Sequence, residues 1–115
     1  MTMDARQTPV PAASLTITVR DSPEAPPRQW RLTCGPPGGD HPAPGAACAA
    51  LASADTPFQP VPPGRLCAQV YGGPQLATIE GTWQGTAVRA EYSRVNACEI
   101  ARWNALAPVF QDSAE

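Results

Sequence analysis

Four cysteines are the residues of this chain whose type and spacing could most directly do chemistry. They are Cys34, Cys48, Cys67 and Cys98, separated by 14, 19 and 31 residues. No CxxC pair is present, so a structural zinc site would have to use all four thiolates at an unusual spacing. An even number of cysteines in a small, loop-rich chain instead favours two disulfides and an oxidising compartment.

The spacing leaves three disulfide pairings open. One of them, Cys34 with Cys48 and Cys67 with Cys98, would close loops of 14 and 31 residues. By the loop-entropy estimate these two bridges would stabilise the fold by about 3 and about 3.7 kcal/mol. The alternative is a cytosolic protein with four buried free thiols.

Few residues could support enzymatic chemistry. His41, the single histidine, lies between Asp40 and Pro42 in a proline-rich segment, where we expect a surface side chain in a turn and a poor general base. The carboxylates that could form an acid–base pair fall on separate predicted elements: Glu80, Glu91 and Glu99. The chain has no GxSxG, P-loop or dinucleotide-binding pattern. We therefore predict that the protein is not an enzyme and uses no metal or cofactor.

Charge and composition limit the classes of partner. The eight basic residues are all arginine, are scattered, and are outnumbered by ten acidic residues. This distribution argues against a nucleic-acid or anionic-membrane partner. No apolar run approaches the ~20 residues of a membrane-spanning helix. The 115 residues include 15 prolines and 9 glycines, so we expect one ordered domain with long, stiff loops.

Alternation of apolar and polar residues predicts the strands of one sheet. The predicted strands are residues 15–19, 29–34, 76–80 and 86–92, with a short last strand at 108–110. Helices are predicted at 45–53, where Pro44 suits the first turn, and at 96–105, where Asn96 and Glu99 would form a capping box. The sum is an α+β fold, a five-stranded antiparallel sheet with two short helices.

The predicted domain spans residues 14–111, between tails at 1–13 and 112–115. Residues 1–7 lack the positive and apolar regions of a secretory signal peptide. Since the cysteines favour an oxidising compartment, we expect a mature secreted form whose first three residues were added for expression and whose first 13 are disordered.

The segment 55–74 is the most unusual part of the chain. It holds five prolines and three glycines and follows neither the helical nor the strand period. Cys67 lies inside it, beside the apolar residues Leu66, Val70 and Tyr71. A cross-linked, partly apolar surface loop is expected to bind a partner. The alternative is a loop that packs over a satellite core.

Five sequence blocks resemble, in order, the Streptomyces subtilisin inhibitor family. The blocks are residues 32–34 (LTC), 41–48 (HPAPGAAC), 66–71 (LCAQVY), 81–85 (GTWQG) and 96–99 (NACE). The resemblance covers about residues 14–110. Members are secreted inhibitors of subtilisin-like serine proteases, usually homodimers built on a five-stranded antiparallel sheet with two helices. The resemblance therefore implies secretion, such a protease as partner, and the disulfides Cys34–Cys48 and Cys67–Cys98.

The resemblance also assigns the residues of a reactive loop. Its scissile bond would be Gln69–Val70, and Gln69, where the family more often has Met, Lys or Arg, would enter the first pocket of the protease. The residues implied to contact the protease are Leu66, Cys67, Ala68, Gln69, Val70 and Tyr71. After them, Gly72-Gly73 makes the segment to Trp83 one residue longer than in the best-known member. Thr16 and Thr18 would face the dimer partner.

Three other functions remain as alternatives. The resemblance also permits inhibition of a secreted metalloprotease, through the same loop. An exposed Gln69 could instead serve as the glutamine donor for a secreted transglutaminase. The third alternative is a structural domain without a protease partner.

Overall fold

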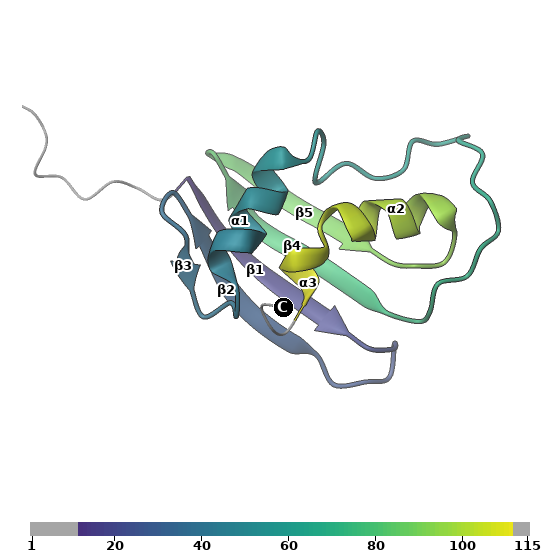
Figure 1. The fold of residues 1–115 in the computed structure, drawn as a ribbon, viewed down its shortest axis with the longest axis horizontal. Coiled ribbons are helices and arrows are strands. Elements are labelled where there is room, and N and C mark those ends of the chain that lie inside the picture. The colour runs from purple at the N-terminus through teal and green to yellow at the C-terminus, as the bar shows by residue number, and fades with distance from the viewer. Residues whose placement is uncertain (1–11, 112–115) are drawn as a thin grey trace, which may run out of the picture.

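The computed structural model describes residues 12–111 and confirms an α+β fold (Figure 1). Its elements are β1 (Ala13–Arg20), β2 (Arg28–Cys34), β3 (Gly38–Gly39), α1 (Pro44–Ser53), β4 (Leu76–Trp83), β5 (Thr86–Tyr92), α2 (Ala97–Ala105) and α3 (Ala107–Phe110). The five strands form one sheet in the order β3-β2-β1-β4-β5, with every neighbouring pair antiparallel. The helices lie over one face of this sheet (Figure 1). The predicted tails lie outside the described residues, except that residues 12 and 13 are described and Ala13 already begins β1.

The core lies between the sheet and the helices. Along β1 every second residue, from Ala13 to Val19, is buried, as the alternating pattern predicted. Ile17 sits at the centre, opposite Trp30 of β2 and Ile79 of β4. The largest fully buried side chains are Leu15, Ile17, Leu32, Leu51, Ile79, Leu106, Val19 and Val109. Along β1 the residues between the buried ones, Ser14, Thr16 and Thr18, are polar and face the other side of the sheet.

The predicted short strand at 108–110 is wrong. These residues belong to α3, and the fifth strand is β3, whose two glycines pair with Leu32 and Thr33 of β2. Three apolar residues carry no period that separates strand from helix, and proline is tolerated in a first helical turn. The glycines of β3 have no side chains from which a pattern could be read.

The β4–β5 hairpin is tighter than predicted. The turn contains only Gln84 and Gly85, both with positive φ, as a two-residue type I′ hairpin requires. Gly81, predicted to lie in the turn, is inside β4. A Cβ there would collide with the carbonyl oxygen of Ser14, so glycine lets β1 and β4 approach.

The expectation of a surface histidine is also wrong. His41 is only 4% exposed. Its Nδ1 accepts the main-chain N–H of Ala43 at 3.0 Å, and its Nε2 donates to the carbonyl oxygen of Val109 at 2.8 Å. In this arrangement Nδ1 is the acceptor and Nε2 the donor of the ring. The histidine therefore ties the loop before α1 to α3, and it is a structural residue.

Candidate functional site

The segment between α1 and β4, residues 54–75, contains the predicted loop. It runs beyond the sheet beside α2 before it returns to β4 (Figure 1). The exposed fractions of Leu66, Val70 and Tyr71 are 96%, 53% and 67%. Three apolar side chains left in water contradict the alternative that this part of the loop packs over a satellite core, and they are typical of a docking surface.

Both disulfides that the resemblance implied are present. Cys34–Cys48 joins β2 to α1, and Cys67–Cys98 joins the loop to the first turn of α2. The Cα atoms of the second pair are 5.4 Å apart, an ordinary disulfide separation. All four cysteines are oxidised, so the zinc and free-thiol alternatives are wrong.

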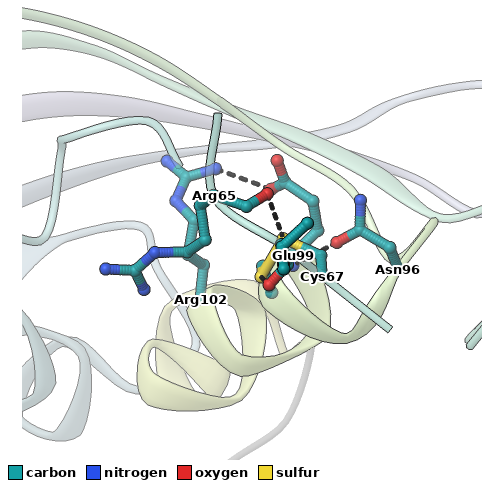
Figure 2. Close-up of a disulfide and its surroundings, with 7 residues drawn as sticks. Arg65, Cys67, Asn96, Glu99 and Arg102 are labelled. Atoms are coloured by element: carbon teal, nitrogen blue, oxygen red, sulfur yellow. Dashed lines mark hydrogen bonds and ion pairs between the residues drawn. A yellow bond between two sulfur atoms is a disulfide. The ribbon is translucent and has the colours of Figure 1, made fainter. Parts of the chain in front are cut away.

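Cys67 lies against the first turn of α2 (Figure 2). The carbonyl oxygen of Ala68 accepts the N–H of Ala97 at 3.0 Å and that of Val70 at 2.9 Å. The second bond places Gln69 at the apex of a three-residue γ-turn. The sulfurs of Cys67 and Cys98 lie 3.7 and 3.8 Å from loop carbonyl oxygens, but these are contacts only, because a disulfide sulfur carries no proton.

The predicted cap of α2 is confirmed in one of its two hydrogen bonds. The side-chain oxygen of Asn96 accepts the N–H of Glu99 at 3.0 Å. The carboxylate of Glu99 does not complete a capping box; it turns to Arg102, whose Nη1 donates to it at 2.8 Å (Figure 2). An ion pair three residues along the helix therefore competes with the capping-box bond.

The beginning of the loop is anchored to the sheet. The Tyr92 hydroxyl donates to the carbonyl oxygen of Pro57 at 2.6 Å. Phe58 meets Trp83 edge to face, with ring centroids 5.6 Å apart. The strand pattern predicted that Tyr92 points inward, but it could not show which loop residue the hydroxyl would reach.

Tyr92 also predicts a dependence of stability on alkaline pH. Burial raises the pKa of its phenol to about 12, while the positive charge of Arg102 opposes that rise. The unfolded-state pKa is about 10, so this contribution to the free energy of unfolding is complete below pH 10 and is lost as the pH rises towards about 12. Tyr92→Phe should remove this dependence and cost about 1 kcal/mol at neutral pH.

Urea unfolding of the parent and of Tyr92→Phe, at neutral and alkaline pH, measures both effects. Tyr71→Phe is the matched control, because Tyr71 is exposed. An alkaline loss of stability that is equally steep in Tyr92→Phe would contradict the assignment.

The outer part of the loop offers a binding segment without catalytic groups. Gln69 and Val70 are exposed. The N–H of Val70 bonds only within the loop, to Ala68, and the nearest main-chain hydrogen bonds to residues outside the loop are those of Ala68 on one side and Gly72 on the other. Gly72 is bonded to Arg94, which precedes α2. Neither Ala97 nor Arg94 was identified from the sequence as an anchor of the loop.

Among residues 12–111 no group of three or more His, Cys, Asp or Glu could hold a metal ion. No helix in that range is long and apolar enough to cross a membrane.

Comparisons with known proteins agree on one family. A family model described as "Subtilisin inhibitor-like" matches residues 11–97. The chain is 40% identical over 94 residues to subtilisin inhibitor-like protein 5 of Streptomyces fradiae, covering 76% of this chain and 87% of that protein. It is 44% identical over 81 residues to the subtilisin inhibitor of Streptomyces albogriseolus, covering 66% of this chain and 54% of that protein.

A solved structure is similar over most of the chain. It is Streptomyces caespitosus sermetstatin in complex with Bacillus licheniformis subtilisin, with a TM-score of 0.55 and 27% sequence identity. The match covers 85% of this chain and 96% of that chain.

Proposed function

Because the chain belongs to the subtilisin inhibitor-like family, we propose that it inhibits subtilisin-like serine proteases by presenting residues 66–71 as a substrate-like segment. The observation that carries the proposal is the exposed apolar loop fastened to α2 by Cys67–Cys98. Relatives are named as inhibitors, and a similar inhibitor has been solved with subtilisin. The family is one of protease inhibitors, so the protein is not an enzyme.

In this proposal the scissile bond is Gln69–Val70. Gln69, at the apex of the γ-turn, enters the first pocket of the protease, and Ala68 and Cys67 run back along the cleft. Leu66, three residues before Gln69, is almost fully exposed in the free protein. In the complex it occupies an apolar subsite of the protease. Val70 and Tyr71 lie on the leaving side. The interface should bury about 1,600 Å² in total, the usual size for a protease–inhibitor pair.

The physical basis of inhibition is a loop ordered before it binds. Fixing the backbone of a free peptide costs about 1–2 kcal/mol per residue. In this chain the cost is met during folding through the disulfide and the bond from Ala97 to Ala68. After the protease serine attacks Gln69, the new amine of Val70 stays nearby, and its high effective concentration favours resealing over hydrolysis.

Mapping the cleaved bond tests the proposed site. Prolonged incubation with a trace of subtilisin should produce a single nick between Gln69 and Val70, with both fragments joined by Cys67–Cys98 until the disulfide is reduced. Mass spectrometry before and after reduction reads this directly. A first cleavage at another bond would move the reactive site elsewhere.

Two other activities of the same loop are kept as alternatives. The exposure of Gln69 suits a glutamine donor for a secreted transglutaminase, which incorporation of a labelled amine at Gln69 would reveal. A secreted metalloprotease is a second class of target for the exposed segment. Assays with purified subtilisin, metalloprotease and transglutaminase test both alternatives. Inhibition of the metalloprotease without inhibition of subtilisin would contradict the serine-protease proposal.

Secretion and dimerisation belong to the same proposal. Two disulfides support an oxidising, extracellular setting. The homodimer would form across the outer face of the sheet, where Thr16 lies opposite Glu80 and Thr18 opposite Thr78. Hydroxyls and charges bury less apolar area than aliphatic side chains, so we expect a dimer that dissociates on dilution. Sedimentation across a concentration series measures this, and a monomer at every concentration would contradict it.

A further inference from the structure

The leaving side of the loop is held at one residue, Gly72. Its N–H donates to the main-chain oxygen of Arg94 at 2.7 Å, and its carbonyl oxygen accepts from Nε of Arg94 at 3.3 Å. Both main-chain polar groups of Gly72 are therefore bonded to the same residue. This arrangement fixes the orientation of the peptide two residues after Val70.

Arg94 is itself held by α2. Its Nη1 donates to the side-chain oxygen of Asn104 at 3.2 Å, and its guanidinium carbon lies 5.8 Å from the centroid of the Trp103 ring. The guanidinium thus bonds to the loop through one nitrogen and to the helix through another. The rigid fork geometry of arginine allows both bonds at once.

Gly72 also lies directly on α2. A Cβ at this position would come within 2.8 and 2.9 Å of two side-chain carbons of Ile100 and within 3.2 Å of the Arg94 carbonyl oxygen. A side chain at this position would force Ile100 to shift, so glycine suits this close approach. Gly72 is therefore held by two hydrogen bonds with Arg94 and by direct packing on Ile100. We call these contacts the clamp.

The other side of the scissile bond is fastened to the same helix. Cys67 is bonded to Cys98, and Ala68 accepts from Ala97. Both ends of the broken chain would therefore remain on one rigid body after cleavage. The disulfide keeps the acyl side in place, whereas the leaving side depends on the contacts of Gly72.

We propose that Arg94 is a positioning residue that keeps the amine of Val70 close to the acyl carbon of Gln69. This inference rests on the proposed function. In the acyl-enzyme, Gln69 is esterified to the protease serine. Attack by the Val70 amine re-forms the amide, breaks the ester and returns a proton to the serine oxygen, whereas attack by water leaves a Gln69 carboxylate. Loss of the clamp favours the second outcome.

The test compares Arg94→Met with the parent after incubation with a trace of subtilisin, starting from both intact and nicked protein. The methionine keeps an alkyl stem and removes the donors. The equilibrium ratio of nicked to intact protein, read by mass spectrometry, should rise about tenfold, the effect of losing a charged hydrogen bond. Immediate inhibition should change little, and protease activity should return sooner.

Arg89→Met is the matched control, because Arg89 is an exposed arginine paired with Glu80 on the outer face of the sheet. It should leave the ratio unchanged. Asn104→Ala provides a second variant in case Arg94→Met does not fold; it frees the guanidinium and should shift the ratio in the same direction. A ratio equal to that of the parent in the folded variants would overturn the inference.

A readout without protease separates this inference from the proposed function. Hydrogen exchange of the Gly72 amide should quicken in Arg94→Met and not in Arg89→Met. If the parent fails to inhibit subtilisin, the proposed function is wrong, and quickened exchange would then show only that the clamp exists. Unchanged exchange would overturn the clamp whatever the result with the protease.

Discussion

Changing Gln69 to Asp is expected to weaken inhibition of subtilisin by about 100-fold or more while leaving the fold intact. The side chain is exposed in the free protein, so the substitution costs little stability. In the complex the carboxylate would be desolvated in the first pocket without a charged partner, and an unpaired buried charge is strongly unfavourable. The inhibition constant and the thermal unfolding midpoint measure the two parts of this expectation.

Gln59→Asp is the matched control for this variant. Gln59 is another exposed glutamine of the same long loop, before the reactive segment, so its substitution adds the same charge to the same connection. It should leave the inhibition constant close to that of the parent. Equal inhibition by Gln69→Asp and the parent would place the protease contact elsewhere on the molecule.

Replacing Cys67 and Cys98 together with serine is expected to convert the inhibitor into an ordinary substrate. The bridge closes a loop of 31 residues. By restricting the unfolded chain it should stabilise the fold by about 3.7 kcal/mol. Without it the acyl side of the loop loses its covalent link to α2 and keeps the hydrogen bond from Ala97 to Ala68, so resealing loses its advantage. Rapid cleavage after Gln69 with full recovery of protease activity should follow, as time-resolved mass spectrometry would show.

The second disulfide provides the control. Replacing Cys34 and Cys48 with serine removes a bridge between β2 and α1, worth about 3 kcal/mol, but leaves the reactive loop fastened to α2. That variant should unfold at a lower temperature and still inhibit for as long as it is folded. Lasting inhibition by the variant without Cys67–Cys98 would refute the role given to that bridge.

Sequence periodicity predicted the elements whose side chains alternate or follow a cap. The strands β1, β2 and β5, both longer helices and the Asn96 cap are confirmed. Elements without informative side chains were missed. The glycines of β3 carry no pattern, and residues 108–110 are too few to separate a strand from a helical turn. The burial of His41 depends on the carbonyl of Val109, 68 residues away.

The binding loop could be predicted in position but not in its anchors. Its prolines, Cys67 and apolar neighbours marked an exposed segment, and the family resemblance supplied the pairing of the cysteines. Ala97 acts through its main-chain N–H, and Arg94 acts through its main-chain oxygen and its guanidinium, in each case on a residue distant in sequence. No local pattern distinguishes such residues, because their partners are set only when α2 packs beside the loop.

Titration of subtilisin with the purified, oxidised protein tests the central claim most directly. Residual activity should fall linearly to zero at one inhibitor chain per active site, and the variant Gln69→Asp should require a large excess. Full protease activity at every molar ratio would contradict inhibition, and cleavage after Gln69 without lasting inhibition would show a loop that is recognised but not held.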